Sequence, residues 1–233
     1  MTGAPLTNPA STLRLILIPA VISLAMTLLR LTGELLHWSE EWFSTGTSGV
    51  IPTGTNWLFG ITWLALPLGA YFACKLLAAG QVPPQTGKAF GHALAGLALV
   101  IVGLFFAAGR LPIPFPQIII SYWVIMATGA AIAWRAWPGL GKTLLAYGLA
   151  ARIPVVVVMF LAMRGNWGTH YDYVGMPPPF QMSLWPKFFW LAFFPQLIFW
   201  VSYTILMGVM TGSLALAAWQ WRQKLRVAET VST

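Results

Sequence analysis

Six polar residues near the N-terminus recur at the spacing of one helix face. Their separations are 4, 3, 4, 3 and 4 positions, for Ser23, Thr27, Arg30, Glu34, His37 and Glu41. These separations place all six on one face if the helix continues to Trp42. Lipid would penalise such a face, so we expect it to look into a helix bundle or a water-filled vestibule. The stripe predicts either an Arg30–Glu34 ion pair below a solvated helix end or a binding site that opens outward.

A second polar stretch runs from Arg164 to Lys187 and contains His170 and Asp172. A break this long between apolar segments is usually functional or disordered, and its aromatic residues argue against disorder. His37 and Glu41 are one helical turn apart, and with His170 and Asp172 they offer ligands suited to zinc or a similar divalent ion. The alternative is that His170 and Asp172 pin the loop by hydrogen bonds. No HExxH or similar signature occurs, and the sequence identifies no cofactor.

Arg152 is the charge placed deepest in an apolar segment. It lies about 18 Å along a helix from Arg164, and Pro154 leaves the carbonyl of Ala150 without its helical donor. An arginine near mid-membrane is by default a functional candidate that faces a cavity, an anion or a buried acid. Since no acid occurs at a matching depth, an anionic lipid headgroup, an anionic solute or backbone carbonyls are the expected partners. The alternative is that Arg152 extends to the cytoplasmic surface.

The composition places these residues in a membrane protein. Charged residues make up 8% of the chain and hydrophobic residues 58%, whereas a soluble domain is about 25% charged. Six apolar segments are each long enough to cross the hydrocarbon as a helix. We therefore predict an all-α fold, a bundle of six transmembrane helices in a single domain spanning residues 1–233. The expected helices cover residues 12–36, 56–79, 89–108, 117–137, 143–163 and 188–221, with long outer loops at 37–55 and 164–187.

The basic residues predict the orientation. One side would carry Arg14, Lys75, Lys88, Arg135, Lys142, Arg222, Lys224 and Arg226; the other would carry Arg30, Arg110, Arg164 and Lys187. The positive-inside rule then places both termini in the cytoplasm, and we expect an inner membrane of bacterial type. Tryptophans at 38, 42, 57, 167 and 185 would mark the outer interface, and those at 134, 137, 219 and 221 the inner one.

The sequence also indicates which binding partners to expect. The net charge of +8 would suggest nucleic acid in a soluble protein, but here the basic residues flank apolar segments, so we expect no nucleic acid. Gly141-Lys142-Thr143 resembles the end of a phosphate loop, yet position 136 is alanine and no strand precedes it, so we expect no nucleotide. The lipid bilayer is the expected partner. Gly208 and Gly212 form a GxxxG pair that would pack helices within one bundle or join a homo-oligomer.

Three functions fit these features. The first is binding or transport of a small polar or anionic solute through an outward vestibule, with Arg152 as a deeper anion contact. The second is a non-catalytic accessory or scaffold subunit of a membrane complex. The third is an outer-face enzyme acting on a lipid-linked substrate. Its acid, base or metal ligands would come from His170, Asp172, Glu34, His37 and Glu41.

Overall fold

A computed structural model describes residues 9–43, 45, 58–83, 86–109, 111, 113–114, 116–173 and 181–232. Every regular element in these ranges is a helix, which confirms the all-α prediction. Trp57 and Arg110 lie outside the described residues, as does most of the expected outer loop at 37–55.

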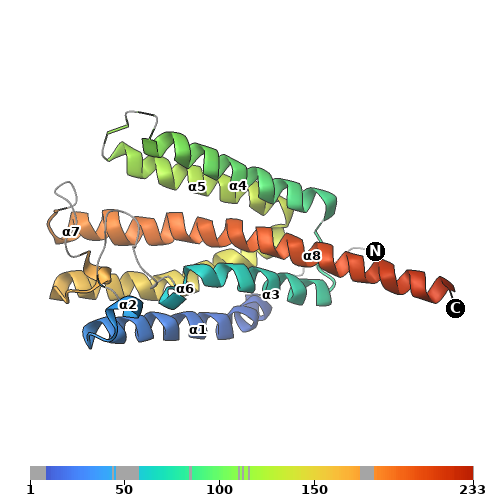
Figure 1. The fold of residues 1–233 in the computed structure, drawn as a ribbon, viewed down its shortest axis with the longest axis horizontal. Helices are drawn as coiled ribbons and strands as arrows, with labels where there is room; N and C mark the ends of the chain where they lie inside the picture. The colour runs from blue at the N-terminus through green and yellow to red at the C-terminus, as the bar shows by residue number, and fades with distance from the viewer. Residues whose placement is uncertain are drawn as a thin grey trace.

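The long helices run alternately in opposite directions (Figure 1). They are α1 (Pro9–Leu35), α3 (Ala65–Ala78), α4 (Thr86–Gly109), α5 (Gln117–Ala136), α6 (Pro138–Gly165) and α8 (Val201–Ser232). Short elements are α2 (Glu40–Phe43), η2 (Thr62–Leu64), η3 (His170–Asp172) and α7 (Leu184–Lys187), and π-helical η5 (Phe188–Phe193) and η6 (Pro195–Trp200) continue α7 into α8.

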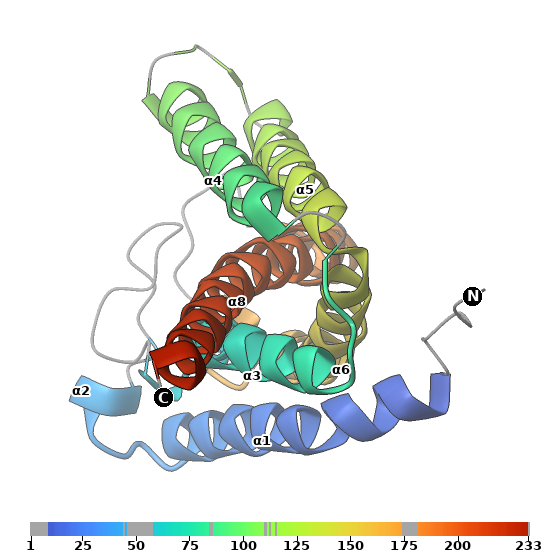
Figure 2. The same ribbon diagram turned by 90° about the vertical axis from the view of Figure 1, so that its right-hand side faces the viewer.

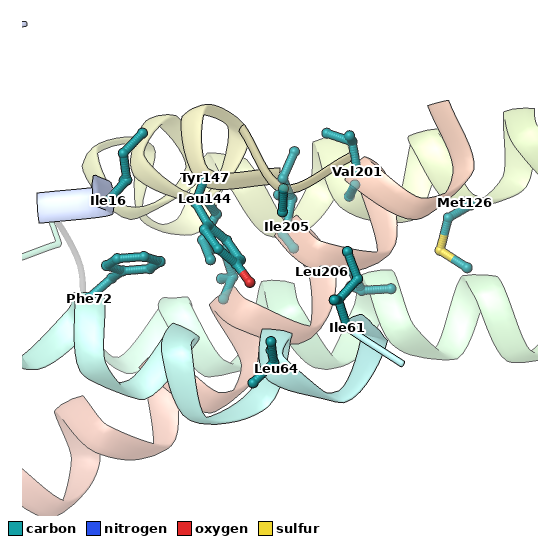
Figure 3. Packing of buried hydrophobic residues seen from close by; sticks show 14 of the residues in the cluster. Ile16, Ile61, Leu64, Phe72, Met126, Leu144, Tyr147, Val201, Ile205 and Leu206 are labelled. Carbon is teal, nitrogen blue, oxygen red and sulfur yellow. The ribbon is translucent and has the colours of Figure 1, made fainter. Parts of the chain in front are cut away.

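The helix α8 is the centre of the arrangement. Figure 2 shows α3 and α6 beside α8, the α4–α5 hairpin standing out on one side and α1 on the other. Glycines allow the closest approaches: a Cβ on Gly69 of α3 would lie 2.4 Å from the backbone of Gly208 on α8. Buried side chains from α3, α5, α6 and α8 fill the core, among them Phe72, Leu144 and Leu206 (Figure 3).

Five helical segments are long and apolar enough to cross a membrane, and one of them is the continuous segment from Leu184 to Val227. In α1, α4 and α5, 22% of the most apolar stretch is buried. The buried share is 50% in α6 and 56% in the segment from Leu184 to Val227. The outward faces of these three helices are therefore apolar surfaces suited to lipid. The second expected segment, 56–79, is a shorter apolar helix over Thr62–Ala78, and the count of six crossings stays a prediction.

Two further boundaries differ from the predicted ones. Pro138 to Gly141, which we expected before the fifth helix, form the first turn of α6, and Trp137 alone separates α5 from α6. Proline suits a first helical position because its missing N–H has no partner there anyway. Trp137, expected at the inner interface, is buried in the core. The last segment begins before 188 and continues beyond 221, to Ser232.

The GxxxG pair packs inside one chain. A Cβ on Gly208 would meet Leu144 at 2.4 Å, and one on Gly212 would meet Leu140 at 2.5 Å and Ala73 at 3.1 Å. Both glycines thus bring α8 against α3 and α6. A homo-oligomer through Gly208 and Gly212 stays a prediction.

Candidate functional site

The polar stripe on α1 faces the interior of the bundle. Ser23, Thr27, Arg30 and Glu34 are all buried, and Glu34 is only 1% exposed. The hydroxyl of Ser23 lies 2.8 Å from that of Tyr147 on α6. We call this line of four buried residues, together with Tyr147, the polar track.

The track ends at Glu34, because α1 ends at Leu35, close to the predicted end at residue 36. The condition that would keep all six residues on one face, a helix continuing to Trp42, is therefore not met. The backbone N–H of His37 donates to Glu34 O at 3.2 Å, and that of Trp38 donates to Gly33 O at 2.9 Å. With His37 at φ 50°, these bonds form a Schellman ending of α1. His37 and Glu41 consequently leave the stripe, and both are exposed.

Glu34 joins α1 to the loop after α6. One carboxylate oxygen, Oε1, lies 2.9 Å from Arg30 Nε and 2.6 Å from His170 Nδ1. The other, Oε2, accepts a hydrogen bond from the backbone N–H of His170 at 3.0 Å. A carboxylate without water needs such charge-assisted partners. The residues brought together here are separated by 136 positions in the sequence.

The loop side of this contact is the turn η3. Thr169 and Asp172 form a capping box: Asp172 Oδ1 accepts from the Thr169 N–H at 2.7 Å, and Oδ2 accepts from the Gly168 N–H at 2.9 Å. Asp172 is buried, and both of its oxygens serve the fold of the turn. The role of Asp172 as a pin for the loop fits this geometry, whereas an acid–base or metal-binding role would break these bonds.

Tyr171 extends from the same turn into the bundle. Its hydroxyl donates to the backbone oxygen of Thr27 at 3.2 Å, and the residue is 4% exposed. Thr27 lies seven residues before Glu34, about 10 Å along α1. The phenol therefore covers the polar track well below the end of the helix.

Burial sets the protonation of the turn. It lowers the pKa of His170, an effect that the hydrogen bond to Glu34 partly offsets, so the neutral imidazole is favoured. Burial also raises the pKa values of Tyr171 and Tyr173, which keeps both phenols protonated. Neutral His170 can then donate its Nδ1 proton to the Glu34 carboxylate.

Arg152 occupies the middle of α6 and is 5% exposed, so it does not extend to the surface. Its Nη1 donates to Gln196 Oε1 at 3.1 Å, its Nη2 to Thr62 Oγ1 at 3.2 Å, and its guanidinium lies 5.1 Å from the ring centroid of Trp200. We call these four residues the Arg152 cluster. In the part of the chain that the structure describes, no carboxylate pairs with Arg152.

The Arg152 cluster adjoins the polar track. The phenols of Tyr147 and Tyr171 lie close enough to interact electrostatically with Arg152, and Tyr171 also interacts with Arg30. Tyr147 packs against Phe72, with ring centroids 5.5 Å apart, among the core side chains of Figure 3. The contact between Ser23 and Tyr147 thus links the polar track to α6, the helix that carries Arg152.

The π-helical stretch supplies two members of the Arg152 cluster. Gln196 and Trp200 both lie in η6, which begins at Pro195. Since proline has no N–H to donate, one helical hydrogen bond is missing at this position. Wider turns of this kind are rare and are frequent at functional sites.

The predicted metal site is not assembled. Among the described residues, no three His, Cys, Asp or Glu side chains are grouped so that they could hold a metal ion. The structure brings His170 to Glu34, while His37 and Glu41 are exposed beyond the end of α1. The physical reason is the left-handed turn at His37, which stops the helix before these residues can share its inner face.

Sequence reasoning missed Thr62, Gln196 and Trp200 as partners of Arg152. A signal existed for Gln196, the one strongly polar residue between Phe188 and Val201. Polar residues inside an apolar segment tend to face the bundle interior. Thr62 and Trp200 carry no comparable signal, because threonine and tryptophan are common in such helices.

Comparison of the chain with known protein families, curated proteins and solved structures found no match.

Proposed function

We propose that the protein is a multi-pass membrane protein that binds, and transports, a small polar solute carrying negative charge, with Arg152 as the contact for that charge. The observation that carries the proposal is a buried guanidinium whose partners among the described residues are neutral. Five long apolar helices support the membrane location.

The energetic argument starts from the cost of burying a charge. Even after the protein relaxes around it, a buried charge costs roughly several kcal/mol in lost hydration unless an opposite charge offsets this cost. Gln196 and Thr62 satisfy hydrogen bonds of Arg152 but bring no negative charge. An anion beside Arg152 would supply it, and an intramembrane arginine that served packing alone would be energetically costly.

A second guanidinium supports the same proposal. Arg30 is buried, and its Nη2 has no hydrogen-bond partner among the described residues, although its Nε is paired with Glu34. Tyr171 interacts electrostatically with both Arg30 and Arg152. Glu34 pairs directly with Arg30 and not with Arg152, so the positive charge of Arg152 has no carboxylate bonded to it among the described residues, which favours an anion there.

The test is anion binding by the purified protein in lipid nanodiscs. Chloride, phosphate and a series of small carboxylates would be titrated, with thermal unfolding and calorimetry as readouts. We expect one class to raise the unfolding temperature, and Arg152→Gln to weaken its binding roughly tenfold or more, since hydrogen bonds to charged groups contribute about 1.5–3 kcal/mol. Uptake into proteoliposomes would then show transport.

The matched control is Arg164→Gln. Arg164 is exposed on the same helix, so its replacement removes an equal charge without touching the Arg152 cluster. Binding that Arg164→Gln weakens as much as Arg152→Gln does would contradict the proposal. So would the absence of binding by any of the anions.

A second candidate is the non-catalytic accessory subunit. The observation that favours it is the closed set of bonds at Arg152, which ties α6 to η2 and to η6. In that case Arg152→Gln would lower the unfolding temperature without any anion effect. Co-purification of the wild-type chain with one fixed membrane partner, lost on Arg152→Gln, would establish this alternative.

A further inference from the structure

We propose that the turn η3 is a plug closing the outer end of the polar track, and that Glu34 is the latch holding it shut. The turn supplies His170 and Tyr171, and α1 supplies Thr27 and Glu34. Access to the Arg152 cluster would then depend on release of this turn. That consequence rests on the proposed function, whereas the plug itself rests on the contacts below.

The plug is inserted rather than laid on the surface. Tyr171 reaches the backbone oxygen of Thr27, about 10 Å below Glu34 along the helix. Both ends of this contact are almost fully buried, at 4% exposure for Tyr171 and 2% for Thr27. In this proposal, the phenol is the barrier between the outer end and Thr27.

The latch depends on one side chain. Glu34 Oε2 accepts the backbone N–H of His170, and Oε1 lies 2.6 Å from His170 Nδ1, while Arg30 holds the carboxylate in place from below. Tyr171 to Thr27 adds a single hydrogen bond between uncharged groups. Hydrogen bonds to a charged group are the stronger kind, so Glu34 dominates the attachment of the turn to α1.

The turn is built to move as a unit. Its internal bonds, from Gly168 and Thr169 to Asp172, do not involve α1. The connection to α6 passes through Asn166, Trp167 and Gly168, all exposed, with Asn166 and Gly168 at positive φ. A rotation at this exposed connection can withdraw His170 and Tyr171 together while the capping box stays intact, as hinge residues do in other lids.

The experiment measures whether water reaches Thr27. Cys74, the single cysteine, would be replaced in Cys74→Ser, and Thr27→Cys added in that background. The protein in nanodiscs would be treated with a membrane-impermeant maleimide. We expect slow labelling with the latch intact, and labelling at least about tenfold faster after Glu34→Gln, because loss of a charged hydrogen-bond partner shifts local opening by that order.

Two controls make the result specific. Glu41→Gln removes an exposed carboxylate from the same end of the molecule and should leave the labelling of Thr27→Cys unchanged. Asn166→Cys reports an exposed site beside the turn and should react at one rate in all backgrounds. Equal labelling of Thr27→Cys with and without Glu34→Gln, in folded protein, would overturn the plug.

A milder pair of variants covers the case in which Glu34→Gln does not fold. Tyr171→Phe removes only the hydroxyl that donates to Thr27, and His170→Ala removes the side chain bonded to Glu34. His170→Ala should accelerate labelling more than Tyr171→Phe does, because it breaks the bond to the carboxylate. If neither variant changes the rate, the plug is likewise overturned.

Labelling needs no solute, so the two proposals can fail separately. If Glu34→Gln accelerates labelling and no anion binds, the plug stands and the proposed function fails. If an anion binds through Arg152 and Glu34→Gln leaves the labelling rate of Thr27→Cys unchanged, the proposed function stands and the plug fails. When both hold, a bound anion should change the labelling rate of Thr27→Cys, and Arg152→Gln should remove that change.

Discussion

Glu34 is the buried residue that joins α1 to the turn η3. Its carboxylate contacts Arg30 of its own helix and both the imidazole and the backbone N–H of His170. Removing one partner of such a group leaves the other partners buried and unsatisfied, which costs more than the pair contributes. A single buried carboxylate can therefore control a whole loop.

His170 makes the latch sensitive to pH. Its pKa in the closed turn is lowered by burial, so the closed form favours neutral imidazole and holds it best above the ordinary histidine pKa of about 6.5. As the pH falls through this range, protons bind more strongly to the opened turn, and the closed form loses stability. The charged groups that act on His170 are Arg30, Glu34 and Asp172.

We expect labelling of Thr27→Cys, relative to Asn166→Cys, to rise between about pH 7.5 and about pH 5.5. The rise is at most about tenfold, the limit for one proton over the single pH unit below the ordinary histidine pKa. His170→Gln should remove most of this rise, because glutamine can still donate a hydrogen bond but does not titrate in this range. A rise that persists in His170→Gln would assign the sensitivity to another group.

At the scale of elements, the contact between α3 and α8 shows how small residues set helix positions. Gly69 faces Gly208 and Thr211 so closely that a Cβ would lie 2.4 Å from both. Close backbone approach lets α3 lie along α8, which in turn holds η2 and Thr62 beside Arg152. Lipid tails are as apolar as the helix surfaces, so no hydrophobic force drives helices together in a membrane. Close packing of this kind is therefore a main source of helix association there.

Gly69→Ala should therefore destabilise the fold by roughly 1–3 kcal/mol, the usual cost of overpacking. Gly91→Ala is the matched control on α4, because nothing lies within 4 Å of a Cβ there, and alanine favours the helix by about 0.5–1 kcal/mol. Thermal unfolding in detergent measures both. Equal unfolding temperatures for the two variants would show that the α3–α8 contact tolerates a methyl group.

At the scale of the whole molecule, one end carries most of the basic residues. The start of α1, the end of α3, the start of α6 and the end of α8 lie on the same side in Figure 1. By their positions in these helices, Arg14, Lys75 and Lys142 belong to this end, as do the basic residues 222–226. Four exposed tryptophans, at 38, 42, 167 and 185, belong to the opposite end. This polarity matches the charge and aromatic patterns of proteins that span a bilayer.

The predicted orientation places this basic end in the cytoplasm. In the Cys74→Ser background, Asn166→Cys should be labelled by an impermeant reagent in intact cells, and Lys224→Cys only after permeabilisation, because positively charged segments stay on the cytoplasmic side. The reverse pattern would invert the orientation. Labelling of both sites in intact cells would contradict the crossing predicted between residues 166 and 224.

Several features could be read from the sequence because they depend on neighbouring residues. Long apolar segments require helices in lipid, and the structure has helices there. The 3- and 4-residue spacing from Ser23 to Glu34 predicted one inward face, and all four residues are buried. The same spacing failed at His37, because a local left-handed turn outweighed the periodicity.

The tertiary structure alone decided which polar groups meet. Glu34 with His170 and Arg152 with Gln196 and Thr62 join positions 136, 44 and 90 residues apart. Periodicity describes which face of a helix a residue occupies, but not which helix that face contacts. Those contacts follow from helix packing, from the glycine approach of α3 to α8 and from the π-helical turns that position Gln196. The chain's local chemistry determined its helices and inward faces, and their packing in space determined the site.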